Sequence, residues 1–213
     1  MIIWLAIPTV VVFFLARGYI VSFLVSGDPA SASAIASILG VLALAILFRS
    51  VYQISSRSFY AQQDTKTPLY ISIFTIGLNI VLAIVLALTL GLGFIGLAMA
   101  QTIAAFVEVV ILFSIMQYRI RGLFTMKLAR AVCKMFFAAA ITFVFTYIAT
   151  QLVPLQATDT SIFVTLPKFL VICLVAGVTY LIASRYFGLR EVNPIIARIN
   201  KIIFSQFKPP RTN

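Results

Sequence analysis

The chain has 213 residues, of which 62% are hydrophobic and only 10% are charged. Soluble domains carry about 25% charged residues, so this composition cannot coat a globule that faces water. A net charge of +11 would suit nucleic-acid binding if it formed a basic face on a soluble fold, but here the bases lie between apolar runs. The composition therefore predicts a membrane protein and argues against a nucleic-acid partner.

Six apolar segments are long enough to cross a bilayer, which takes roughly 20 residues per helix. In chain order they cover residues 2–24, 34–54, 69–90, 94–117, 135–153 and 168–187. Backbone groups inside lipid must be satisfied within each segment, and no alternating barrel pattern is visible, so all six are expected to be helices. The predicted fold is an all-α polytopic membrane protein with six transmembrane helices.

The connections between these segments alternate in charge. Two, five and six Lys or Arg residues lie, respectively, in residues 55–67, in residues 118–134 and in the tail from Arg185. No Lys or Arg lies in residues 26–33, 91–93 and 154–167. The positive-inside rule therefore predicts that the basic connections and both termini are cytoplasmic.

The tail beyond the sixth segment has a helical pattern of its own. Ile195, Ile199 and Ile202 recur at helical spacing, and Arg198 and Lys201 lie between them. This pattern predicts a basic amphipathic helix along the inner leaflet. The alternative is a frayed tail that is basic only because it determines topology.

The inventory of reactive side chains argues against an enzyme. There is no histidine, and the five carboxylates are spread over both sides of the membrane and its interior: Asp28, Asp64, Glu108, Asp159 and Glu191. Acid–base pairs and metal clusters both require neighbouring ligands. Cys133 and Cys173 are far apart and are expected to be small buried thiols. The sequence thus predicts no catalysis, no metal and no cofactor.

A glycine-rich stretch joins the third and fourth segments. Gly91, Gly93 and Gly96 match the dinucleotide fingerprint GxGxxG, but no strand precedes them and no βαβ unit surrounds them. The stretch instead predicts a tight helix–helix turn. Close packing is expected to follow through Gly96, Ala98, Ala100 and Ala104.

Two charges at matching depth are the main functional hint, because charge inside lipid costs several kcal/mol. At about 1.5 Å per residue, Arg49 lies ~22 Å and Glu108 ~21 Å from the outer face, so they can pair across a cavity. Arg17 lies ~22 Å from the inner face and is not expected to reach Glu108. Both arginines can instead snorkel to the nearer interface. Glu108 can equally serve a purely structural pair, and Asn79 can be interhelical glue rather than a ligand.

The second connection reads Arg57-Ser-Phe-Tyr-Ala-Gln-Gln-Asp-Thr-Lys-Thr-Pro68. It suits a corner where the chain re-enters the membrane. Pro68 fits the first turn of a helix, and Asp64 or Thr65 can cap its free N–H groups. Arg57 and Lys66 would hold the corner on the cytoplasmic side.

This corner closely resembles the "FYA…DTKTP" signature of the MurJ/MviN lipid II flippase family, within the MATE-like multidrug/oligosaccharidyl-lipid/polysaccharide exporter superfamily. The resemblance is carried by Phe59, Tyr60, Asp64, Thr65, Lys66, Thr67 and Pro68. Asn79 and the segment Gly96-Leu-Ala-Met-Ala100 are also similar to the family pattern.

The family plan implies fourteen helices, with two six-helix lobes around a cavity and two further helices that form a groove for a lipid tail. This chain resembles the last six helices. On that plan, residues 1–117 are four helices of the second lobe, 118–134 a basic cytoplasmic loop, 135–187 the two additional helices and 188–213 the basic tail. The first lobe would be a missing part of the same protein or a separate chain, in agreement with the abrupt membrane run after Met1.

The resemblance implies part of a lipid II flippase in the bacterial plasma membrane. Its substrate would be the undecaprenyl-pyrophosphate-linked peptidoglycan precursor used in cell-wall biogenesis, and membrane lipid would be its other partner. Candidate residues on the substrate path are Arg17, Arg49, Arg57, Glu108 and Asn79. Glu108 stands where the family more often has a neutral polar residue. The alternatives are a fragment of a polysaccharide-lipid or multidrug exporter, and a non-transporting membrane assembly subunit.

Overall fold

The computed structural model describes residues 2–24, 29–119, 126–154, 162–189 and 192. Every regular element in these ranges is a helix. The elements are α1 (Ile2–Leu15), α2 (Arg17–Leu24), α3 (Pro29–Ala61), α4 (Lys66–Ile84), the π-helical η1 (Val85–Thr89), α5 (Gly93–Arg119), α6 (Met126–Leu152) and α7 (Ile162–Tyr186). The predicted amphipathic helix of the tail lies outside the described residues, as do Asp28, Asp159 and Glu191.

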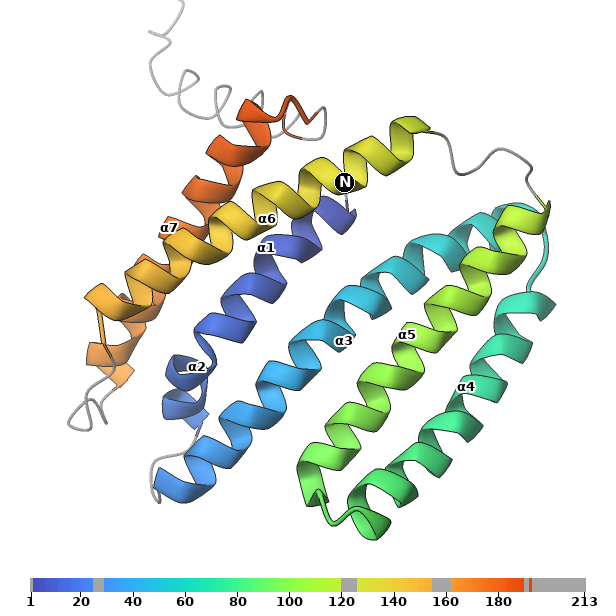
Figure 1. Cartoon of the computed structure of the whole chain (residues 1–213), viewed down its shortest axis with the longest axis horizontal. Helices are drawn as coiled ribbons and strands as arrows, with labels where there is room; N and C mark the ends of the chain where they lie inside the picture. The colour runs from blue at the N-terminus through green and yellow to red at the C-terminus, as the bar shows by residue number, and fades with distance from the viewer. Residues whose placement is uncertain (1, 25–28, 120–125, 155–161, 190–191, 193–213) are drawn as a thin grey trace, which may run out of the picture.

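The long helices run up and down alternately, so that their ends gather at two opposite ends of the bundle (Figure 1). We call the end where α1 begins and α3 finishes the basic end, because α3, α5, α6 and α7 carry Arg57, Arg119, Arg130, Lys134 and Arg185 there. The other end, where α3 begins, is called the opposite end. Lys168 lies in the second turn of α7, and its Nζ donates to the Pro154 carbonyl at 3.3 Å at that opposite end.

The prediction of an all-α polytopic membrane protein is confirmed, with one difference. Within the described residues, five helical segments are long and apolar enough to cross a membrane. The first predicted segment is instead interrupted at Ala16 and divided into α1 and α2. Ala16 is fully buried against Tyr19 and Ile172, and Gly18, a weak helix former, lies two residues further on. Hydrogen bonds from Ala16 N to the Val12 carbonyl (2.7 Å) and from Ile20 N to the Ala16 carbonyl (3.1 Å) join the two parts.

The helices extend further than their apolar cores. α3 continues through Arg57 to Ala61, and α6 begins at Met126, inside the predicted basic loop. The described parts of α5 and α6 therefore reach into both ends of the predicted loop of residues 118–134. Hydropathy marks where lipid lies, whereas a helix continues beyond the hydrocarbon as long as its backbone bonds are favourable.

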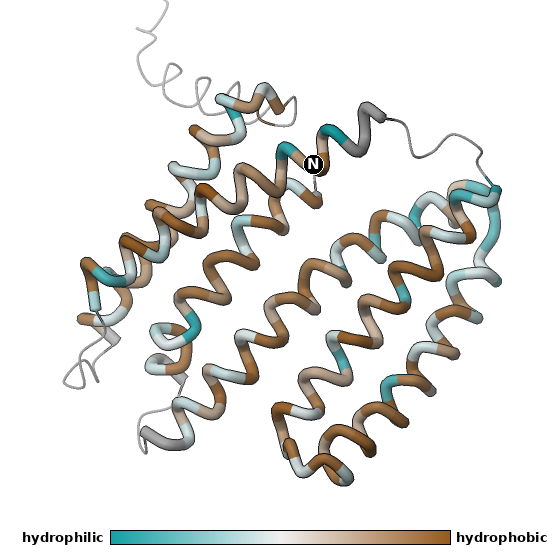
Figure 2. The backbone as a smooth tube through the Cα atoms, viewed as in Figure 1, coloured by the Kyte–Doolittle hydropathy of each residue, from teal (hydrophilic) through white to brown (hydrophobic). Residues whose placement is uncertain are grey.

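The helices pack in two groups that meet where α1 and α2 contact α3. α3, α4 and α5 form one group around Phe59, Ile71, Leu112 and Met116, all buried. α6 and α7 pack with α1 around Trp4, Met135, Ala138, Tyr180 and Ala183. Hydrophobic residues occupy the middle of the helices, and hydrophilic residues concentrate at the corner between α3 and α4 (Figure 2). Many large apolar side chains are exposed, as expected where lipid is the solvent.

Candidate functional site

The turn between α4 and α5 sets these two helices side by side. Gly91 and Gly93 have φ of +67° and +55°, values that glycine adopts without strain. At Gly96, an added Cβ would lie 2.7 Å from the backbone carbon of Leu86, so only glycine permits this approach. Ala98, Ala100 and Ala104 of α5 are buried as well, and the prediction of a tight turn followed by small-residue packing is confirmed.

A carboxylate is buried inside this close-packed group. Glu108 of α5 is only 4% exposed, and it faces α4. Its Oε1 accepts hydrogen bonds from Ser72 Oγ at 2.9 Å and from Thr75 Oγ1 at 3.3 Å. Tyr52 of α3 extends the network, since its hydroxyl lies 2.7 Å from Ser72 Oγ. A buried carboxylate with such donors is held in one orientation.

Arg49 of α3 stands at the edge of the same cluster. Its Nη1 lies 3.9 Å from Glu108 Oε2, the carboxylate oxygen that Ser72 and Thr75 leave open. The predicted juxtaposition of Arg49 with Glu108 is therefore present. The two partners differ sharply in environment, because the Arg49 side chain is 52% exposed and that of Glu108 only 5%. The guanidinium is thus positioned to exchange partners, whereas the carboxylate is not.

The Arg49–Glu108 pair borders a cavity of about 230 Å³. The cavity is lined by Arg49, Ser72, Thr75, Ile76, Asn79, Ala104, Ala105 and Glu108. Asn79 donates through Nδ2 to Gln101 Oε1 and so joins α4 to α5, as the interhelical interpretation of this residue predicts. A second cavity, of about 490 Å³, also has Arg49 in its lining, together with Gln53 and Gln101. Arg49 is therefore accessible from two cavities.

The corner at the basic end, where α3 gives way to α4, is closed by its own hydrogen bonds. Asp64 Oδ1 accepts from the backbone N–H of Thr67 at 3.0 Å, and Asp64 Oδ2 accepts from the Thr67 hydroxyl at 2.6 Å. Thr65 makes no side-chain capping bond, so Asp64 is the residue that caps α4, and Pro68 is buried in the first turn. These bonds, reinforced by Arg119, lower the pKa of Asp64 to about 2.

Arg119, the last residue of α5, completes this corner. It forms an ion pair with Asp64, donates to Thr67 Oγ1 at 3.1 Å and lies over the Phe59 ring at 5.6 Å. We call Phe59, Asp64, Thr67 and Arg119 the corner latch, because together they join the ends of α3, α4 and α5. The remaining polar and aromatic motif residues point outward, since Arg57, Tyr60 and Lys66 are exposed.

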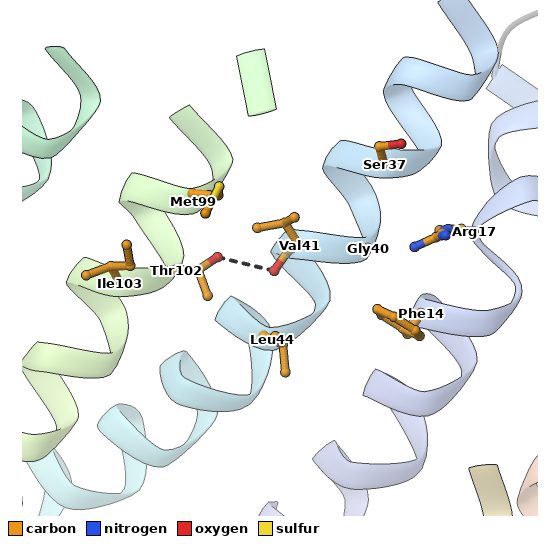
Figure 3. A pocket seen from close by; sticks show the side chains of 9 residues that line it. All are labelled: Phe14, Arg17, Ser37, Gly40, Val41, Leu44, Met99, Thr102 and Ile103. Carbon is orange, nitrogen blue, oxygen red and sulfur yellow. Dashed lines mark hydrogen bonds between the residues drawn. The ribbon is translucent and has the colours of Figure 1, made fainter. Parts of the chain in front are cut away.

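Arg17 lies apart from the Arg49–Glu108 pair, in agreement with its predicted depth. It opens α2, its guanidinium lies 5.1 Å from the centre of the Phe14 ring, and it abuts Gly40 of α3. Figure 3 shows this side chain at the edge of a cavity between α3, α5 and the α1–α2 break. Arg17 takes part in neither of the described ion pairs, which are Arg49–Glu108 and Arg119–Asp64.

Sequence reasoning missed several residues of these sites. Ser72 and Thr75 were missed, although with the predicted Asn79 they recur at helical spacing on α4, and this polar stripe within an apolar helix was a usable signal. Arg119 gave no such signal, because it is 55 residues from Asp64. The expectation of buried thiols is wrong for Cys133, which is exposed. Cys133 lies two residues from buried Met135, on the other face of α6.

In the described ranges, no three His, Cys, Asp or Glu side chains gather as a metal site. A comparison with curated proteins finds no match to the chain. A family model described as lipid II flippase MurJ matches residues 1–167. This match takes in α1 to α6, including the corner latch and the Arg49–Glu108 pair, and it covers more than half of the chain. The chain therefore belongs to the lipid II flippase MurJ family.

Proposed function

We propose that this chain supplies the second-lobe and lipid-groove helices of a lipid II flippase. It would move the undecaprenyl-pyrophosphate-linked peptidoglycan precursor across the bacterial plasma membrane by alternating access. Family membership supports the substrate class. The single observation that carries the transport mechanism is the half-exposed Arg49 beside the buried Glu108. A first lobe, in the same protein or as a separate chain, would enclose the path.

The charge arrangement suggests how an anionic headgroup is handled. Glu108 keeps Arg49 neutralised when no substrate is bound, which lowers the cost of a guanidinium at membrane depth. The planar fork of the guanidinium can donate to two oxygens of a pyrophosphate. This is a better match than one carboxylate oxygen 3.9 Å away. The headgroup therefore displaces Glu108 from Arg49, and the pair re-forms when the headgroup leaves.

Arg57 and Asn79 extend this path in opposite directions along the bundle. Arg57 is exposed toward the basic end of α3, eight residues or about 12 Å from Arg49. Asn79 lines the Arg49 cavity on its other side. With the basic end and both termini in the cytoplasm, an anion would meet Arg57 first and Arg49 second. The proposed units are residues 1–117 for the second lobe, 118–134 for the basic cytoplasmic segment, which includes the end of α5 and the start of α6, 135–187 for the lipid-groove helices and 188–213 for the tail.

Complementation tests the proposal. The full chain would be expressed with a flippase first lobe in a bacterium depleted of its own lipid II flippase. We expect growth with the wild-type chain. Arg49→Gln should lower the transport activity that supports this growth by about tenfold or more, because charge-assisted hydrogen bonds contribute about 1.5–3 kcal/mol. Arg185→Gln, which removes an exposed charge from the end of α7, is the matched control.

Two outcomes would count against the proposal, each at a different level. Failure of the wild-type chain to support growth, with both parts present in the membrane, would favour an assembly subunit without transport. Growth restored equally by Arg49→Gln would remove Arg49 from the path. Replacing lipid II by other polyprenyl-linked glycans in proteoliposomes would separate the flippase from a related exporter.

A further inference from the structure

Arg17 is a charged side chain in the apolar part of the bundle, and the Arg49 path does not use it. It is the first residue of α2, which continues for only seven more residues to Leu24, or about 10 Å. Arg17 thus lies toward the opposite end of the bundle, away from the corner latch. Its guanidinium abuts Gly40 so closely that a Cβ on Gly40 would overlap Nη1.

Two cavities share this side chain. One, of about 390 Å³, is lined by the α1–α2 break, α3 and α5, and its apolar wall includes Leu44 and Ile103 (Figure 3). The other, of about 440 Å³, lies between the α1–α2 break and α6 and includes Phe143. Phe14 and Arg17 belong to both linings and therefore stand between the two cavities.

The hydroxyls of Ser37, Thr102 and Thr150 around Arg17 are already engaged. The hydroxyl of Thr102 lies within hydrogen-bond distance of the Ala98 and Val41 carbonyls, at 2.9 and 3.2 Å. Ser37 donates to the Ser33 carbonyl at 3.0 Å and Thr150 to the Tyr147 carbonyl at 2.7 Å. In the cavity between the α1–α2 break, α3 and α5, the guanidinium is therefore the lining side-chain donor that remains for a ligand. In the cavity toward α6 it is joined by the Tyr147 hydroxyl and the Gln151 amide. Phe14 holds one face of it, which leaves its N–H edge for in-plane contacts.

We propose that Arg17 and its two cavities form a binding site for the phosphate of a lipid. The guanidinium fork matches phosphate oxygens, and the apolar walls match the attached chain. Gly40 is a positioning residue in this site, because its missing side chain allows the guanidinium to lie against α3. The inference deepens the proposed function by adding a second anion site, nearer the end of the bundle opposite the signature corner.

Lipid binding to the purified full chain in nanodiscs tests this site. The probes are a polyprenyl pyrophosphate, phosphatidylglycerol and inorganic pyrophosphate, and the readout is the dissociation constant. We expect Arg17→Gln to weaken the binding of the phosphate-bearing lipids by about tenfold or more. Preference for the polyprenyl probe would identify the transported substrate as the ligand, and equal affinities would identify a bulk phospholipid. Both results support a lipid-phosphate site. If inorganic pyrophosphate, which has no lipid chain, binds as tightly as the two lipids, the apolar walls have no role in binding and the proposal is overturned.

Two glycine variants separate the effect of the position of the Arg17 guanidinium from the effect of its charge. Gly40→Ala keeps Arg17 but displaces its guanidinium, so it should weaken lipid binding. Gly77→Ala in α4 meets no atom within 4 Å and should not. Unchanged affinity in both Arg17→Gln and Gly40→Ala, with normal thermal stability, would overturn the proposal.

One further variant examines a structural role for the arginine. Arg17→Lys keeps the charge but loses the planar guanidinium fork. If Arg17→Gln lowers the melting temperature, Arg17→Lys restores it and neither changes lipid affinity, Arg17 is a structural cation. These binding results are independent of the Arg49 complementation, so either proposal can fail alone.

Discussion

At the scale of single residues, the Glu108 carboxylate shows how a charge is tolerated among apolar helices. Ser72 and Thr75 satisfy one of its oxygens, and Arg49 lies near the other. The hydroxyls belong to the same close-packed group as the carboxylate, whereas the guanidinium reaches it from a half-exposed position. The two kinds of partner can therefore be separated by mutation.

Glu108→Gln and Glu108→Leu should differ in stability. Glutamine keeps an oxygen that accepts from Ser72 and Thr75, so the fold should persist while Arg49 loses its counter-ion. Leucine removes the carboxylate acceptor and leaves the hydroxyls of Ser72 and Thr75 only Tyr52 and the Ser72 carbonyl as partners. Each hydrogen bond lost contributes about 0.5–1.5 kcal/mol. We expect a lower melting temperature for Glu108→Leu than for Glu108→Gln in detergent, and reduced transport for both. Wild-type transport by Glu108→Gln would show that the negative charge is dispensable.

At the scale of elements, the corner latch ties three helix ends through one carboxylate. The pKa of Asp64 is lowered from 3.8 to about 2, so the charged form stabilises the folded state. This contribution is fully present above about pH 4 and disappears as the pH falls through about 2. The latch is therefore intact at neutral pH.

Asp64→Asn keeps a capping oxygen but removes the charge that pairs with Arg119, so it should lower the melting temperature at pH 7 by about 2 °C. The difference from wild type should narrow as the pH approaches 2. Melting curves in detergent between pH 2 and 7 would measure it, with Asp64→Asn in an Arg119→Gln background as the control for the ion pair. A difference that does not depend on pH would rule out ionisation as the cause.

The turn between α4 and α5 offers a second test at this scale. Gly96→Ala places a Cβ 2.7 Å from the backbone of Leu86, which cannot move aside as a flexible side chain would. Overpacking of this kind costs about 1–3 kcal/mol. We expect a clear loss of thermal stability in Gly96→Ala. Gly177→Ala in α7, where nothing lies within 4 Å, should be neutral. Equal stability of the two variants would mean that the turn relaxes freely.

At the scale of the whole molecule, the charge distribution predicts orientation. Cys133 is exposed on α6 between Arg130 and Lys134, at the basic end, and Cys173 is partly buried within α7. A membrane-impermeant maleimide should therefore label Cys133 in inverted vesicles and not in right-side-out vesicles. Cys133→Ser is the control that assigns the signal. Labelling only in right-side-out vesicles would place the basic end outside.

Much of the fold could be predicted from sequence, because hydropathy depends on composition over whole segments. The Arg49–Glu108 pair followed from depth alone, since a helix converts residue count into distance. The latch could not be found this way, because Arg119 meets Asp64 only once α5 has packed beside α4. The break at Ala16 likewise depends on burial against Ile172, far along the chain. Local pattern thus predicts elements, and packing decides which polar groups meet.

The break at Ala16 also bears on how the chain enters the membrane during synthesis. α1 has 14 residues, or about 21 Å, less than the roughly 30 Å of hydrocarbon that it must cross. Its continuation, α2, carries Arg17, which disfavours partitioning of this segment on its own. α3 has 33 residues and packs along both α1 and α2. We therefore expect the first segment to insert stably together with α3, the helix it contacts most, and the two to leave the translocation machinery as one helical hairpin.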